Sequence, residues 1–270
     1  MSTLKIGSVS YFNSLPLTHY LPWECEKHTP AILTEKILNN TLDVALLPVA
    51  SILQNNLQAY PEAGLIGCEG LVKSVGFFTK PHIESLADIQ TLYLDTESRT
   101  SVLLAQIILK HHLQRNLKSI QLVPLAQCHL ADAQVLIGDK ALFFSEPGYT
   151  YHDLGALWQQ FTGQGFVFAC WASQKPLSRL MIADLKQAKE KGLANLSQIA
   201  DATIEATRRA QVLDYWQNNI VFQLNDSLKK GYGIFEKLLK EENFFNQSTE
   251  LNSFYTYLNP TQPKEIFSLN

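Results

Sequence analysis

The chain has 270 residues, of which 46% are hydrophobic and 17% charged, so it can bury a large core as one big domain or two ordinary ones. Its net charge of -3 and pI near 6.2 exclude the basic footprint of a nucleic-acid-binding protein. An anionic ligand must therefore be small and held by local dipoles rather than by a global field.

The first half of the chain alternates strand-like and helix-like patterns. Residues 4–9 predict a strand, and a helix is expected after Thr29, a suitable N-cap that is followed by Pro30 in the first turn. The run "DVALLPV" is apolar almost throughout and predicts a buried strand, and two more strands are expected at "AGLIGCEG" and "KSVGFFTK". This alternation is typical of an α/β protein.

A second unit is expected after Lys80-Pro81. It contains a strand "TLYLD", a largely apolar helix over residues 99–113, strands at "SIQLVPL" and "AQVLIGDKAL", and a helix that leads into a strand "FVFACWAS". From Pro176 onward the pattern is helical. We predict two lobes with a cleft between them: residues 1–78 and 169–270 form lobe 1 with the C-terminal helices, and residues 79–168 form lobe 2.

Cysteine and histidine spacings give no sign of a metal site. The four cysteines are scattered without a CxxC pair, and the seven histidines form no HExxH motif. We expect free thiols in a reducing compartment and neither a metal nor a cofactor.

The first residues, "MSTLKIGSVSYF", lead almost directly into a strand and lack the parts of a signal peptide. No apolar stretch approaches the length that spans a bilayer. We expect a cytoplasmic protein that has no membrane partner and is either a monomer or a homodimer.

The stretch "DTESRTS" places hydroxyl groups where a strand ends and a helix begins. The free N–H groups and the dipole of that helix, together with the hydroxyls, predict a carboxylate site. The alternative is that one hydroxyl residue is only an N-cap and the others lie on the surface. Arg99 either follows the polar stripe of the helix into solvent or bends into the cleft. The candidate ligand-binding residues of this stretch are Thr96, Ser98, Arg99, Thr100 and Ser101.

The opening turn "SYFNSLP" is the second candidate. It supplies Ser10, Tyr11 and Asn13, and the Asn13 amide can both donate to and accept from a ligand hydroxyl or carboxylate. Alternatively, these residues only end a strand and start a helix before Pro16. Ligands of α/β proteins collect at the carboxyl ends of strands, where both turns are expected.

Two further residues are candidates for chemistry. Ser74 is expected on a strand beside Gly76, facing either the cleft or the outside. Asp139 follows the strand "VLIG" and is a candidate general base, a ligand acceptor or a helix cap. The residues alone thus predict a cleft for a small polar anion and leave catalysis open.

The motifs named above resemble those of one known family. "IGSVSYFNSLPL", "LDVALLPVAS", "VKSVGFFTK", "LDTESRTSVLLAQIIL", "VLIGDKAL" and "DLGALWQQFTGQGFVFACWAS" follow one another in that family's order. Over roughly residues 5–173, the chain is similar to the chorismate dehydratases of the futalosine route to menaquinone, the MqnA type. The sister family, dihydroxynaphthoate synthase, usually opens with a turn like "SPCPNDTF", whereas this chain has "SYFNSLP".

The resemblance implies a two-lobed fold of the type II periplasmic-binding-protein kind and chorismate as substrate. Through the ring diene, the ring carboxylate makes the proton on the ether-bearing ring carbon acidic. Loss of this proton, followed by loss of the neighbouring hydroxyl, gives the aromatic 3-[(1-carboxyvinyl)oxy]benzoate and water. Helix-terminal amides near residues 98–101 would hold one carboxylate, and Asn13 and Ser74 would position the leaving hydroxyl or the other carboxylate. The base is either Asp139 or the enolpyruvyl carboxylate of the substrate, and we favour the second because the turns are poor in bases. Asn13, Ser74 and Asp139 are thus the catalytic candidates.

Two alternatives to this function remain. One is a cytoplasmic protein of the same fold that binds or senses a small carboxylate without catalysis, since fold does not determine function. The other is the sister synthase, which would not react with chorismate.

Overall fold

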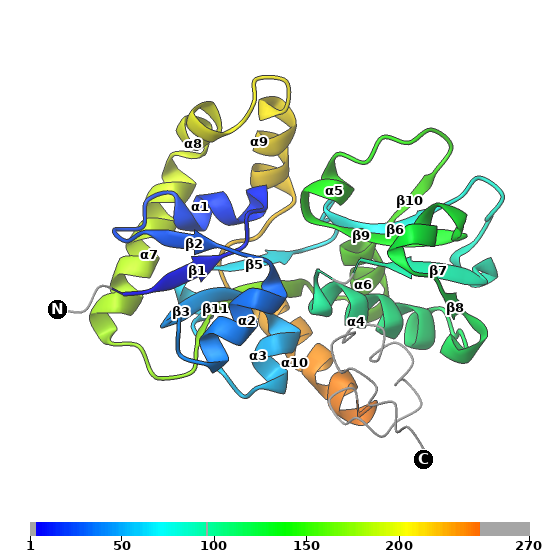
Figure 1. The fold of residues 1–270 in the computed structure, drawn as a ribbon, viewed down its shortest axis with the longest axis horizontal. Coiled ribbons are helices and arrows are strands. Elements are labelled where there is room, and N and C mark those ends of the chain that lie inside the picture. The colour runs from blue at the N-terminus through cyan, green and yellow to red at the C-terminus, as the bar shows by residue number, and fades with distance from the viewer. Residues whose placement is uncertain (1–3, 96, 244–270) are drawn as a thin grey trace, which may run out of the picture.

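The computed structural model describes residues 4–95 and 97–243, which form two lobes built around separate sheets (Figure 1). The predicted two-lobed α/β architecture is confirmed. The helices of the described chain are α1 (Leu15–Thr18), α2 (Pro30–Leu38), α3 (Val49–Gln54), α4 (Arg99–Ile107), α5 (Gly138–Leu142), α6 (Leu154–Thr162), α7 (Arg179–Ala194), α8 (Leu196–Thr203), α9 (Arg209–Asn218) and α10 (Asp226–Glu241).

The sheet of lobe 1 has the strand order β2-β1-β3-β11-β4, with β5 also paired to β11. β1 is parallel to β2 and β3, whereas β11 runs antiparallel to β3, β4 and β5. Its strands are β1 (Ile6–Ser8), β2 (Cys25–Lys27), β3 (Val44–Pro48), β4 (Gln58–Ala59), β5 (Leu65–Cys68) and β11 (Phe166–Ser173). β3 is buried at every position, as its apolar run predicts.

The sheet of lobe 2 has the order β10-β6-β9-β7-β8. β7 is parallel to β8 and β9, and β6 is antiparallel to β9 and β10. Its strands are β6 (Val75–Thr79), β7 (Thr91–Leu94), β8 (Gln121–Leu122), β9 (Ala133–Ile137) and β10 (Thr150–Asp153). β7 and β9 end beside each other, so the segments that follow them, which lead into α4 and α5, lie at the same edge of the sheet.

The chain crosses between the lobes twice in its described part, after β5 and after α6 (Figure 1). Among the described residues, β6 pairs only within the second sheet, and β11 only within the first. The expected lobe limits at residues 78 and 168 stay a prediction. We propose limits that follow the sheets, with the crossovers at residues 69–74 and 163–165.

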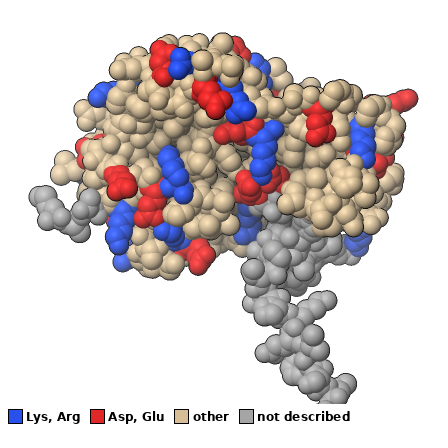
Figure 2. All heavy atoms as spheres, turned by 45° about the horizontal axis from the view of Figure 1, so that its top comes forward, with Lys and Arg blue, Asp and Glu red and all other residues tan. Residues whose placement is uncertain are grey.

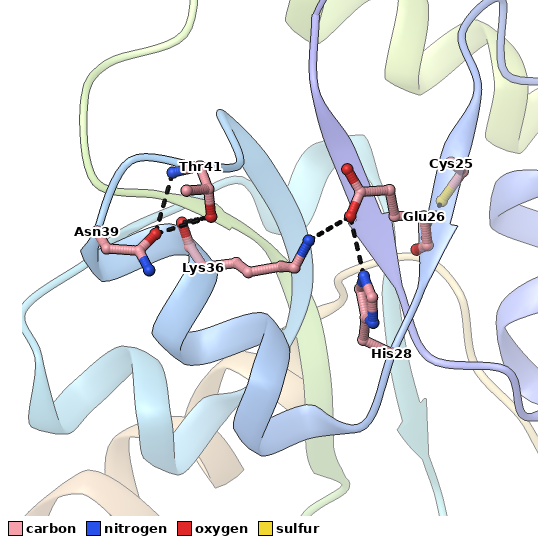
Figure 3. A network of polar contacts seen from close by, with 6 residues as sticks. All are labelled: Cys25, Glu26, His28, Lys36, Asn39 and Thr41. Atoms are coloured by element: carbon pink, nitrogen blue, oxygen red, sulfur yellow. Dashed lines mark hydrogen bonds and ion pairs between the residues drawn. The ribbon is translucent and has the colours of Figure 1, made fainter.

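The edge of the first sheet carries a charged network on β2 and α2 (Figure 3). The Glu26 carboxylate lies 2.5 Å from Lys36 Nζ and 2.9 Å from His28 Nε2. The hydrogen bond from Lys36, followed by that from His28, lowers the pKa of Glu26. Charges at an edge strand hinder pairing with other chains. Acidic and basic side chains are interspersed over the face seen in Figure 2.

Of the C-terminal helices, α7 packs against α1 and α10 against β11, and α10 approaches lobe 1 through a glycine. A Cβ atom at Gly231 would lie 1.8 Å from the carbonyl oxygen of Gly165, so the helix backbone can approach this closely only without a side chain. Gly233, on the same helix, has nothing within 4 Å of a Cβ position. No helix in the described residues is long and apolar enough to cross a membrane.

We therefore expect opposite effects of alanine at these two glycines. Gly231→Ala should lower the free energy of unfolding by about 1–3 kcal/mol, because α10 must move away from residue 165. Gly233→Ala should raise it by about 0.5–1 kcal/mol, because alanine loses less backbone entropy in a helix. Urea unfolding of both variants tests this, and equal stabilities would contradict the close packing of α10.

Candidate functional site

The opening turn (residues 9–14) connects β1 to α1 and is held by a buried serine. Ser14 Oγ donates to the carbonyl oxygens of Val9 and Tyr11, each at 2.9 Å. Pro16 lies in the first turn of α1, where its missing N–H costs nothing. The turn thereby directs the Tyr11 and Asn13 side chains toward lobe 2, where both line a cavity.

The turn before α4 is capped by Ser98. Its Oγ accepts a hydrogen bond from the Ser101 backbone N–H at 3.3 Å and lies 3.0 Å from the Ser101 hydroxyl. The N-terminal amides and positive dipole end of α4 therefore lie beside two hydroxyls, an arrangement that suits a carboxylate. Thr96, also a candidate, lies outside the described residues.

The two turns meet at a cavity of about 60 Å³, called the inner cavity below. Its polar lining comes from the opening turn, the lobe crossover and the start of α4, and its walls include Ile66, Val75, Ile137 and Phe168. The polar lining residues are Tyr11, Asn13, Ser74, Ser98 and Ser101. Five of the ten candidate residues thus share one hollow between the lobes.

The other candidates lie elsewhere. Arg99 lines a neighbouring outer cavity of about 510 Å³ together with Glu35 and Glu97, and Pro30 and Pro48 line both cavities. Thr100 is buried, and its Oγ1 accepts the Ala50 N–H of α3 at 3.1 Å, so it joins the lobes. Ser10 is exposed and is not among the lining residues of the inner cavity.

Asp139 bonds to the opening turn and is not among the lining residues of the inner cavity. Its Oδ1 accepts the Phe12 backbone N–H at 3.1 Å across the cleft, while the neighbouring Gly138 lines the cavity. Burial raises the pKa of Asp139 to about 6, although the Phe12 N–H and the charge of Arg208 act in the opposite direction. This geometry makes Asp139 an anchor of the turn.

A second contact between the lobes involves Tyr11. Its hydroxyl donates to Glu97 Oε2 at 2.6 Å, and Lys140 Nζ donates to Glu97 Oε1 at 2.7 Å and to Asp95 Oδ2 at 3.2 Å. Burial alone would raise the pKa of Glu97, but the hydrogen bonds from Lys140 and Tyr11 hold it below its usual value. Burial and the Glu97 carboxylate raise the pKa of Tyr11, so its hydroxyl stays protonated.

Ser74 is presented to the inner cavity by a tight crossover. The Asp153 carboxylate accepts the backbone N–H groups of Val72 and Lys73, and it also caps α6. Lys73 has φ +60°, and the Ser74 N–H donates back to the Val72 carbonyl at 2.8 Å. The crossover is therefore fixed at the point where the Ser74 side chain enters the cavity.

Tyr215, on α9, belongs to the site and was missed from the sequence. Its hydroxyl lies 2.7 Å from Ser74 Oγ, and the next residue, Trp216, donates its indole N–H to the Phe12 carbonyl at 3.0 Å. An aromatic pair on an amphipathic helix gives only a packing signal in the sequence. Its place behind the cavity depends on tertiary structure.

The inner cavity is suited to binding and orienting a polar anion. Of the described residues that line it, only Tyr11 has an ionisable side chain, and that hydroxyl is bound to Glu97. Asn13 Oδ1 is buried and has no hydrogen-bond partner in the described part of the chain. No three His, Cys, Asp or Glu side chains of the described residues are grouped as metal ligands would be. An unpaired buried acceptor costs free energy unless a ligand donates to it.

Comparison with known proteins adds a family and a fold. The sequence model of a family described as "Menaquinone biosynthesis" matches residues 4–241. A chorismate dehydratase from Thermus thermophilus is 28% identical in an alignment of 271 positions that covers 88% of this chain and 96% of that protein.

Solved structures share the fold at low identity. Protein AF1704 from Archaeoglobus fulgidus has a TM-score of 0.69 at 11% identity, over 90% of this chain and 99% of that one. The alkanesulfonate-binding protein SsuA from Xanthomonas axonopodis pv. citri, bound to MOPS, has 0.62 at 15% identity, over 91% and 95%. The periplasmic aliphatic sulphonate binding protein SsuA from Escherichia coli has 0.58 at 14% identity, over 90% and 88%. The expected periplasmic-binding-protein-like fold is thus confirmed.

Proposed function

The chain belongs to the menaquinone biosynthesis family, and from this premise we propose that the protein is a chorismate dehydratase. It would eliminate water from chorismate to give 3-[(1-carboxyvinyl)oxy]benzoate. The observation that carries the proposal is the inner cavity, where Asn13, Ser74 and Ser98 meet from separate segments. The relative of this activity is matched over nearly its whole length, which supports the same conclusion.

The cavity offers partners for one carboxylate and for the ring hydroxyl of this substrate. One carboxylate would lie at the start of α4, where the backbone amides and the hydroxyls of Ser98 and Ser101 can donate to it. The ring hydroxyl would lie between Asn13 and Ser74. Orientation of the substrate in this way contributes much of the rate enhancement when aromatisation itself drives the reaction.

We propose that the base is the enolpyruvyl carboxylate of the substrate. It would take the proton from the ring carbon that bears the ether, and the neighbouring C–O bond would then break, with the hydroxyl leaving as water once it is protonated. The lining of the inner cavity supports this, because its only ionisable side chain in the described residues is the Tyr11 hydroxyl. The protein would supply position and hydrogen bonds to the developing negative charge.

Asp139→Asn tests the role of the carboxyl that follows Gly138 of the cavity lining. We expect turnover within about threefold of wild type, because an amide oxygen can still accept the Phe12 N–H. Complete loss of turnover with chorismate binding intact would instead make Asp139 the base.

The same variant should change the pH dependence of stability. The folded pKa of about 6 exceeds the ordinary value of 3.8, so the folded state binds protons more tightly than the unfolded state. As the pH rises from 4 through 6, the free energy of unfolding of the wild type should therefore fall relative to that of the variant, by roughly 3 kcal/mol at most. Parallel pH profiles of the two proteins in urea unfolding would contradict this environment for Asp139.

A ring compound with two carboxylates needs more room than the inner cavity of about 60 Å³ provides. We propose that the lobes move apart for binding by rotation within the two crossovers, at residues 69–71, which precede the stretch that Asp153 holds, and at residues 163–165. Hinge closure of this kind would remove water from the bound substrate.

Incubation of the purified protein with chorismate tests the function directly. The expected result is the appearance of an aromatic absorbance and of the NMR signals of 3-[(1-carboxyvinyl)oxy]benzoate, with boiled protein as control. Binding without turnover would indicate the non-catalytic sensor, and absence of both would leave the sister synthase. The expected cytoplasmic location stays a prediction that fractionation of the source cells would test.

A further inference from the structure

We propose that Tyr215 is a positioning residue, whose hydroxyl orients Asn13 and Ser74 so that one presents an acceptor and the other a donor to the inner cavity. The kinetic consequences of this inference rest on the proposed function, whereas the hydrogen-bond geometry that supports it is independent of that function.

The hydroxyl of Tyr215 lies where two cavity-lining side chains converge. It is 2.7 Å from Ser74 Oγ, and only 1% of the residue is exposed. Burial raises the pKa of Tyr215, and side-chain hydrogen bonds with Ser74 and Asn13 act against this rise. The hydroxyl is therefore protonated and buried, and it is bonded to Ser74 and influenced by Asn13.

Counting donors and acceptors fixes the direction of this network. Asn13 Oδ1 has no partner among the described residues, so we assign the Asn13 NH₂ group, which can only donate, to the Tyr215 hydroxyl. A tyrosine hydroxyl has one hydrogen, which is then available for Ser74 Oγ. Asn13 consequently presents its carbonyl oxygen to the cavity, and Ser74 presents its O–H hydrogen.

This polarity suits the leaving hydroxyl of the proposed substrate. The Asn13 carbonyl would accept the hydrogen of that hydroxyl, and Ser74 would donate to its oxygen as the C–O bond breaks. Without Tyr215, the Asn13 amide can flip and the Ser74 hydroxyl can rotate, so both arrangements become populated. The lost interaction stabilises the transition state more than the bound substrate, so its loss lowers kcat rather than raising KM.

Helix α9 holds Tyr215 rigidly between the lobes. Gln211 Nε2 donates to the Leu142 carbonyl at the end of α5 at 2.9 Å, and Trp216 Nε1 donates to the Phe12 carbonyl. These contacts reach lobe 2 and the opening turn, respectively. Residues on rigid helices hold a site more precisely than residues on loops do.

Tyr215→Phe tests the inference, with Tyr60→Phe as the matched control. The Tyr60 hydroxyl is likewise buried and hydrogen-bonded, to the Ser173 hydroxyl at 3.2 Å, the Leu177 N–H at 2.9 Å and Gln58 Oε1 at 3.5 Å, but Tyr60 is not among the residues lining the inner cavity. With chorismate as substrate, we expect Tyr215→Phe to lower kcat by about 10- to 100-fold with KM changed less than threefold. Tyr60→Phe should lose similar thermal stability and keep wild-type kcat. Wild-type kcat in Tyr215→Phe, or equal losses in both variants, would overturn the inference.

An NMR readout separates this inference from the proposed function. The side-chain amide signals of Asn13, assigned by their loss in Asn13→Leu, should shift and exchange faster with solvent in Tyr215→Phe but not in Tyr60→Phe. If the wild-type protein does not convert chorismate, the proposed function fails and these signals alone decide: a selective change supports the inference, and unchanged signals overturn it.

Discussion

Replacing Asn13 by leucine is expected to lower the turnover of chorismate by about 100-fold or more, which is typical for removing one aimed hydrogen-bonding group from an active site. Asn13 lines the inner cavity, and its unpartnered Oδ1 is the acceptor that the leaving hydroxyl would use. Leucine has nearly the same size and shape, so it removes the polar group without opening a large hole. Steady-state kinetics with chorismate gives the measurement.

The folded protein should tolerate this change. Leucine removes a buried acceptor that has no partner in the described residues, which stabilises the folded state, and it also removes the NH₂ group assigned to the Tyr215 hydroxyl, whose loss offsets this gain. Loss of turnover together with an unchanged melting temperature would separate a role in the reaction from a role in folding. Asn195→Leu is the control, because Asn195 donates to the Lys191 carbonyl at the end of α7 and does not line the cavity. Turnover within threefold of wild type in Asn13→Leu would remove Asn13 from the site.

Replacing Ser98 by aspartate should abolish substrate binding while preserving α4. Aspartate is as good an N-cap as serine, and its charge favours the helix dipole. The same carboxylate would occupy the start of α4, where a substrate carboxylate is proposed to bind. Two like charges about 4 Å apart repel by about 4 kcal/mol in a partly solvated site, which corresponds to a loss of affinity of about 10²- to 10³-fold.

The control for this substitution is an identical cap elsewhere in the chain. Ser178 begins α7 and accepts the Met181 N–H at 3.2 Å, just as Ser98 accepts the Ser101 N–H at 3.3 Å, but it is exposed and away from the cavity. Ser178→Asp should keep both the melting temperature and the chorismate KM. Ser98→Asp should keep the melting temperature only. Equal KM values in the two variants would place the substrate carboxylate somewhere other than α4.

Local sequence patterns predicted much of the fold. The apolar run of β3, the Pro30 at the start of α2 and the serine-rich start of α4 each depend on a few neighbouring residues, and all three elements form as expected. The division into two lobes also followed from the pattern, because two strands bracket the middle unit.

The site was only partly predictable from the same patterns. Tyr11, Asn13, Ser74, Ser98 and Ser101 share the inner cavity, whereas Thr100 uses its hydroxyl on Ala50. A Ser/Thr cluster indicates a helix start, but it does not say which hydroxyl faces the neighbouring lobe. Asp139 is similar: its position after β9 was evident, but its bond to the Phe12 N–H depends on the other lobe.

Hydrophobic periodicity and helix capping act over a few residues, so the elements and the polar side chains at their ends could be predicted from local patterns. Which of these side chains meet depends on tertiary packing, which also brings in Tyr215, whose partner Ser74 is 141 positions away in the chain. Such a contact results from the packing of both lobes and α9 together, and no local pattern encodes it.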